Sequence, residues 1–162
     1  MMGDAKKPIL CLDFDGVLHS YTSGWKGARE IPDLPVPGAI KFLLAARTQF
    51  DVAILSSRSH HWFGRMAMRE WLREWVFEYL WDLYAVSNEL PNPVIEANAR
   101  DWFEHGAIDE ELREAARRIV ATLKFPLHKP PAHITLDDRA ITFTGNWPDL
   151  NSLAMFEPWY KN

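Results

Sequence analysis

The sequence predicts an α/β fold with a mostly parallel sheet, and two observations support this prediction. Residues 8–13 ("PILCLD") and 51–57 ("DVAILSS") are short apolar runs without regular alternation, which is typical of strands buried on both faces. Residues 37–50 ("PGAIKFLLAARTQF") lie between them and predict a helix that opens at Pro37 and Gly38 and ends near Gln49. Strand, helix, strand is the order of a parallel α/β unit.

The next elements continue this pattern. Residues 19–37 are rich in Gly, Pro and polar residues and predict a long loop or flap. From Ser59 to about Tyr84 the chain predicts a helix, with one apolar stripe formed by Met68, Trp71, Leu72, Trp75, Tyr79, Leu80 and Leu83. Because Val76, Phe77 and Trp81 fall off this stripe, the helix is either covered on two sides or broken.

The second half of the chain predicts further helices and strands. Helices are expected to begin at Asn92 and at Asp109, each acting as an N-terminal cap. The prolines of "KFPLHKPP" (124–131) predict an irregular segment. The end of the chain predicts, in order, a strand at 132–138 ("AHITLDD"), a strand at 140–145 ("AITFTG") and a short helix within 147–159.

Composition is typical of a globular protein and excludes several other classes. We expect a single domain over residues 1–162, since this length fits one hydrophobic core. No apolar stretch approaches the roughly 20 residues of a membrane span, and the short run before Asp13 is not typical of a signal peptide. The single cysteine, Cys11, forms no internal disulfide, which favours the cytoplasm. A net charge of −4 gives no support for nonspecific binding to nucleic acid.

Acidic and hydroxyl side chains follow three of the predicted strands: Asp13 and Asp15 the first, Ser56 and Ser57 the second, Asp137 and Asp138 the third. The carboxyl ends of parallel strands share one edge, where such sheets bind ligands, so we expect these side chains to converge. Four carboxylates at one edge require a cation to neutralise them. Oxygen ligands without His or Cys favour a hard ion such as Mg²⁺, and a carboxylate is also a nucleophile toward phosphorus.

In their order, "DFDGVL", "AILSS", "KPP" and "TLDD" resemble the four motifs of the haloacid dehalogenase-like superfamily of phosphohydrolases, and the ending "LDDRAITFTGNWP" resembles its small bacterial and phage members. The resemblance implies a Rossmann-like three-layer αβα sandwich that binds Mg²⁺ and forms an aspartyl-phosphate. It implies Asp13 as nucleophile and Asp15 as general acid/base. The metal ligands would be the Asp13 carboxylate, the Asp15 backbone carbonyl and the fourth-motif acids, with Asp138 touching the ion and Asp137 orienting water or the lysine.

The two remaining motifs leave alternatives open. The second motif is a Ser or Thr at a strand end, which corresponds to Ser56, with Ser57 as the alternative. The third is a lysine, for which Lys129 is preferred over Lys124 because it lies just before the acid-bearing strand. Gly16, Ser57 and Arg58 are candidates for contacting the substrate, Arg58 through an anionic group.

Insertions that cap the site differ among members of this superfamily. Here the slot at 16–37 is too short for a domain, and the slot at 59–128 holds either the helices that the core requires or a small helical cap, so no large cap is expected. The expected substrate is a phosphorylated small molecule or nucleotide. A phosphatase acting on nucleotides or nucleic-acid 3′-ends is the alternative, and a catalytically idle binding or assembly module is the alternative from another class.

Overall fold

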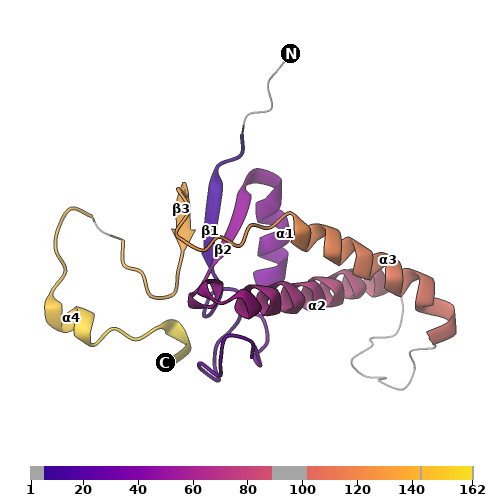
Figure 1. Cartoon of the computed structure of the whole chain (residues 1–162), viewed down its shortest axis with the longest axis horizontal. Helices are drawn as coiled ribbons and strands as arrows, with labels where there is room; N and C mark the ends of the chain where they lie inside the picture. Colours follow the sequence, from indigo (N-terminus) through magenta and orange to yellow (C-terminus); the bar gives the residue numbers. More distant parts are fainter. Residues whose placement is uncertain (1–5, 89–101, 143, 162) are drawn as a thin grey trace, which may run out of the picture.

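The chain forms a three-stranded parallel sheet with helices, as seen in a computed structural model that describes residues 6–88, 102–142 and 144–161 (Figure 1). The strands are β1 (Ile9–Asp13), β2 (Asp51–Leu55) and β3 (Ile134–Leu136), in the spatial order β2-β1-β3. In the register, Leu12 lies beside Ile54 on one side and Leu136 on the other. The three predicted strands at 8–13, 51–57 and 132–138 are therefore confirmed, and their carboxyl ends meet at one edge.

The hydrophobic core joins one face of this sheet to the long helices. Leu10, Leu12, Val52 and Ile54 occupy alternate strand positions and therefore share a face. They form one cluster with buried residues of α1 (Ala39–Gln49), α2 (Trp62–Ser87) and α3 (Trp102–Ala121). The described residues thus establish a small α/β fold, while the three-layer sandwich is not confirmed and stays a prediction.

An irregular crossover carries the chain from the outer edge of β2 to β3. At its start, Lys124 bonds through its backbone to Val52 and Ile54. At its end, the His133 N–H donates to the Ile9 carbonyl, and Figure 1 shows the segment passing from α3 across β2 and β1 to β3. The irregular structure predicted for 124–131 is therefore confirmed, and the crossover delivers Leu127, His128 and Lys129 to the carboxyl edge of the sheet.

Helix α2 is continuous and covered on two sides. It packs against both α1 and α3, and Val76, Phe77 and Trp81 are buried although they fall off the predicted stripe. Leu83, predicted to lie on that stripe, is 48% exposed. Of the two alternatives for this helix, coverage on two sides is correct.

Two other predictions are wrong. Helix α3 begins at Trp102, so Asp109 lies inside the helix and does not cap it. The strand predicted at 140–145 is not formed by the described residues of that range. The helix predicted to begin at Asn92 falls outside the described residues.

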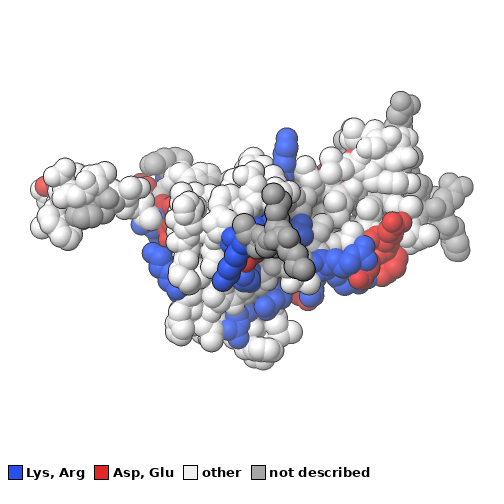
Figure 2. Space-filling model, turned by 90° about the horizontal axis from the view of Figure 1, so that it is seen from above, with Lys and Arg blue, Asp and Glu red and all other residues white. Residues whose placement is uncertain are grey.

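The C-terminal segment leaves the body of the protein and returns to it. It contains α4 (Leu150–Ala154) and the 3₁₀ helix η2 (Trp159–Lys161), as predicted for a short closing helix and tail. Figure 2 shows the region around α4 as a lobe with few charged side chains, set apart from the rest of the face in view. Its exposed apolar side chains include Trp147, Leu150 and Met155. No helix in the described ranges is both long and apolar enough to cross a bilayer.

Candidate functional site

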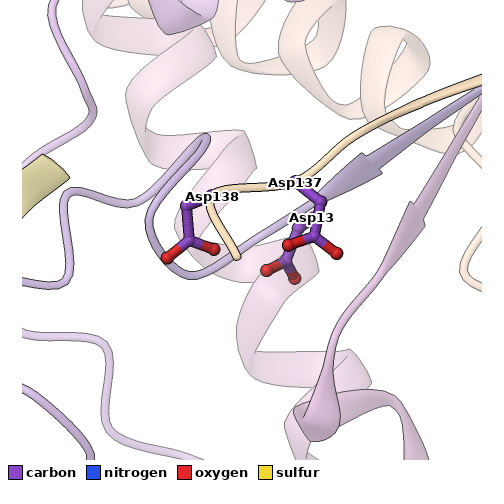
Figure 3. Close-up of side chains that lie close together, drawn as sticks. All are labelled: Asp13, Asp137 and Asp138. Carbon is purple, nitrogen blue, oxygen red and sulfur yellow. The ribbon is translucent and has the colours of Figure 1, made fainter. Parts of the chain in front are cut away.

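Three carboxylates meet at the carboxyl edge of the sheet (Figure 3). Asp13 is the last residue of β1, and Asp137 and Asp138 directly follow β3, which pairs with β1. One carboxylate oxygen from each lies within 4.8 Å of the others. Parallel pairing of two strands that end in acids produces this cluster, as the sequence predicted.

Among the described residues, not every carboxylate oxygen of the cluster has a hydrogen-bond or ion-pair partner. The Asp138 side chain is 1% exposed, and its Oδ1 has no hydrogen-bond partner in the part of the chain that is described. Burial, together with the negative charges of Asp137 and Asp138, raises the pKa of Asp13 to about 8. Without a cation, the cluster therefore retains a proton near neutral pH.

Gly16 allows the turn after β1 to approach this cluster. Its φ of +91° lies in the left-handed region that glycine adopts without strain. A Cβ at this position would lie 2.6 Å from Asp138 Cγ and 2.9 Å from a ring carbon of Tyr160. Gly16 was expected to contact substrate, but its visible role is to let the turn pack against Asp138.

The carboxylate of Asp15 is held by donors from three residues. His19 Nδ1 lies 2.9 Å from Oδ1, Arg58 Nε lies 2.9 Å from Oδ2 and 3.1 Å from Oδ1, and Ser56 Oγ lies 3.3 Å from Oδ2. Burial alone would raise the pKa of Asp15, but the hydrogen bonds from His19 and Arg58 hold it below its ordinary value. Asp15 is therefore an ionised, fully hydrogen-bonded carboxylate, and its side chain lies outside the three-acid cluster.

His19 is the residue that the sequence analysis missed here. It is fully buried, and the backbone N–H of Asp33 donates to its Nε2 at 3.2 Å. This assigns the ring proton to Nδ1, which faces Asp15. Its position four residues after Asp15 was visible in the sequence, but nothing there predicted that the flap would bury the ring.

Arg58 connects Asp15 to the flap and does not line the pocket. Its side chain is 0% exposed, and Nη1 donates to the carbonyl oxygens of Gly27, Ala28 and Glu30 at 2.7, 3.1 and 2.9 Å. The Trp25 ring lies 4.7 Å from its guanidinium carbon. The expected contact between Arg58 and an anionic substrate group is therefore not supported.

The two serines after β2 have different environments. Ser56 caps the 3₁₀ helix η1 (Ser57–His60), its Oγ accepting the Arg58 N–H at 3.2 Å while donating to Asp15. Both serines line the pocket, but Ser57 is exposed, and no hydrogen bond of its side chain is seen among the described residues. Ser57 thus has the hydroxyl that is available to a ligand.

The two candidate lysines lie at opposite ends of the sheet. Lys124 Nζ lies 2.8 Å from Asp51 Oδ2, at the first residue of β2. Lys129 lines the pocket together with Asp13 and Asp137. The geometry therefore agrees with the preference for Lys129 over Lys124.

The acidic cluster opens into a pocket of about 510 Å³. Several lining residues were not predicted from the sequence, namely Tyr21, His60, Leu127, His128 and Arg139. The rings of His60 and His128 lie 6.1 Å apart. Helices α2 and α3 contribute none of the described lining residues, so they support the core and do not roof the pocket.

The residues present fit a hard divalent cation. The donors are carboxylate oxygens only, which Mg²⁺ prefers, and the orphaned Asp138 Oδ1 is an acceptor that a cation would satisfy. In comparisons with known proteins, no protein-family model, curated protein or solved structure matches this chain. The likeness to phosphohydrolases therefore depends on the four motifs and on the convergence of their acids.

Proposed function

We propose that this protein is a Mg²⁺-dependent phosphohydrolase of the haloacid dehalogenase-like type, acting on phosphomonoesters through an aspartyl-phosphate on Asp13. The observation that carries the proposal is the three-carboxylate cluster with its orphaned Asp138 oxygen, at the edge of a pocket that also holds Lys129. A Rossmann-like three-layer sandwich and a cytoplasmic location belong to the same proposal.

The chain's own residues have distinct roles in this mechanism. When bound, Mg²⁺ would be held by Asp13, Asp137 and Asp138, and it would neutralise the phosphate and the cluster. The Asp13 carboxylate attacks phosphorus, forming the acyl phosphate as the bond to the leaving oxygen breaks. Ser57 and Lys129 bind the transferred oxygens, and a water then hydrolyses the acyl phosphate and releases Asp13.

Asp15 is better prepared to accept a proton than to donate one. Donors from His19, Arg58 and Ser56 surround its oxygens, so a protonated Asp15 would lose at least one of these bonds. In the first step the leaving group therefore departs with little protonation. In the second step Asp15 orients the attacking water and acts on it as a weak base, because the same donors lower its pKa. The rate of the first step is expected to depend strongly on leaving-group acidity.

A screen of purified protein with Mg²⁺ tests this function. The panel combines aryl phosphates, sugar phosphates, nucleotides and 3′-phosphorylated oligonucleotides, which separates a metabolite phosphatase from one that acts on nucleic-acid ends. Asp13→Asn should abolish turnover while the protein stays folded, and Lys129→Ala should lower it far more than the matched control Lys124→Ala. Full activity of Asp13→Asn would exclude the mechanism.

A second candidate is a catalytically idle assembly module. It is favoured by the exposed apolar side chains of the C-terminal lobe, where Trp147 is 88% exposed. A module of this kind should give a defined oligomer in size-exclusion chromatography and no turnover on any member of the panel. Turnover that requires Asp13 would exclude it.

A further inference from the structure

We propose that Arg139, held in place by Tyr160 of the C-terminal segment, binds the non-bridging oxygens of the substrate's phosphate together with Ser57 and Lys129. This inference rests on the proposed function, because it names the group that would recognise the phosphate in the same pocket. It also assigns a role to the C-terminal 3₁₀ helix, for which the sequence motifs provide none.

The Arg139 side chain lines the pocket directly beside the acidic cluster. Its Nε lies 3.4 Å from Asp138 Oδ2, and its Nη2 donates to the Tyr160 hydroxyl at 2.5 Å. Its guanidinium carbon lies 5.8 Å from the Tyr21 ring. Two guanidinium nitrogens, Nε and Nη2, thus have protein partners, although more than half of the side chain remains exposed.

The two carboxylate oxygens of Asp138 have different surroundings. Oδ2 faces Arg139, whereas the buried Oδ1 has no partner and is available to a cation. Asp13, Asp137 and Asp138 would hold a cation, and Arg139 adds a second positive charge at the same edge of the pocket. Such positive charge stabilises the negative charge of a transferring phosphoryl group.

The C-terminal segment is anchored where it meets this arginine. Trp159 Nε1 donates to the Gly16 carbonyl at 2.8 Å, and the Tyr160 ring meets Tyr21 edge-on at 5.7 Å. Tyr160 also fills the space that a Cβ on Gly16 would need. The Trp159–Gly16 bond joins residues 143 positions apart, so η2 acts as a strap across the turn after β1.

Other cationic side chains near the site are less suited to binding two oxygens of one phosphate. Arg58 is fully buried and occupied by Asp15 and the flap. Lys129 lines the pocket but is a point charge on a flexible stem. Among the described residues that line the pocket, Arg139 is the one guanidinium, the group whose planar fork matches two phosphate oxygens.

The test is titration calorimetry of the full-length protein with inorganic phosphate at saturating Mg²⁺. Arg139→Gln should weaken phosphate binding about 10- to 100-fold, and Arg139→Lys should recover part of this loss. Tyr160→Phe, which removes one hydroxyl, should weaken it by a smaller factor. Mg²⁺ affinity should not fall in these variants, because the loss of the Arg139 charge beside Asp138 favours the cation, and Arg118→Gln on the outer face of α3 should match the wild-type protein.

Several outcomes would overturn the inference. These are phosphate affinity within twofold of wild type in Arg139→Gln, equal losses of Mg²⁺ and phosphate affinity, or no phosphate binding by the wild-type protein. Should Arg139→Gln fail to give a cooperative melt, Arg139→Lys and Tyr160→Phe decide the question. Arg139-dependent phosphate binding without turnover of any ester would uphold this inference while refuting the proposed function.

Discussion

The acidic cluster predicts that the metal-free protein becomes less stable as the pH rises. Asp13 has a folded-state pKa of about 8, above its ordinary value of 3.8. Between these values the folded protein binds a proton that the unfolded chain does not, so the free energy of unfolding falls as the pH rises through this window. The slope is about 1.4 kcal/mol per pH unit, which gives a loss of about 2.7 kcal/mol between pH 5.5 and 7.5.

Urea denaturation in EDTA at several pH values measures this slope. Asp13→Asn should remove it, because the amide carries no titrating proton, and the variant should therefore be more stable than wild type at pH 7.5. Asp82→Asn on the exposed surface of α2 is the matched control and should keep the wild-type slope. Millimolar Mg²⁺ should flatten the slope of the wild-type protein, because the cation replaces the proton. Equal slopes in wild type and Asp13→Asn would refute the reasoning.

Three substitutions test the packing around the site. Gly16→Ala should lower the melting temperature more than Gly24→Ala does. Both glycines have positive φ, which alone costs an alanine about 1 kcal/mol, but only at Gly16 would the new Cβ clash with Asp138. Arg58→Lys should lower the free energy of unfolding by about 3 kcal/mol, since Lys cannot bridge Asp15 and the flap carbonyls. The flap should also become sensitive to limited proteolysis, and an unchanged cleavage rate would contradict this. Ser56→Ala should cost about 1 kcal/mol through loss of the η1 cap, measured by urea denaturation, and a loss below 0.3 kcal/mol would count against that role.

Strong local patterns made the strands and the acidic cluster predictable from the sequence. When two neighbouring strands are parallel and both end in acids, the acids meet at the same edge of the sheet. Strands β1 and β3 are such a pair. The preference for Lys129 stays a prediction, but the geometry agrees with it: from Lys124 the chain runs parallel to β2 towards the carboxyl edge of the sheet, and Lys129 lines the pocket there before the chain returns to the start of β3.

The incorrect predictions come from positions where tertiary contacts override local preference. Asp109 has the chemistry of a cap, but α3 starts at Trp102, and the 26-residue α2 offers a surface along which the additional turns can pack. Residues 140–145 have strand-forming composition, but their described part has no neighbouring strand, and strand preference has little effect without a partner. The predicted contact between Arg58 and an anionic substrate group is not supported by its position under the flap, which the sequence does not reveal.

Asp13 and Asp15 are two residues apart, but the protein neutralises them in different ways. Asp15 is neutralised from within, by Arg58 and the hydrogen bonds of His19 and Ser56. Asp13 faces two more carboxylates and retains a proton in the absence of a cation. A protein with only a structural need for acids at this edge would pair both of them. The contrast supports the proposal that a cation from outside the chain neutralises Asp13, whereas Asp15 is fixed in advance by the chain's own residues.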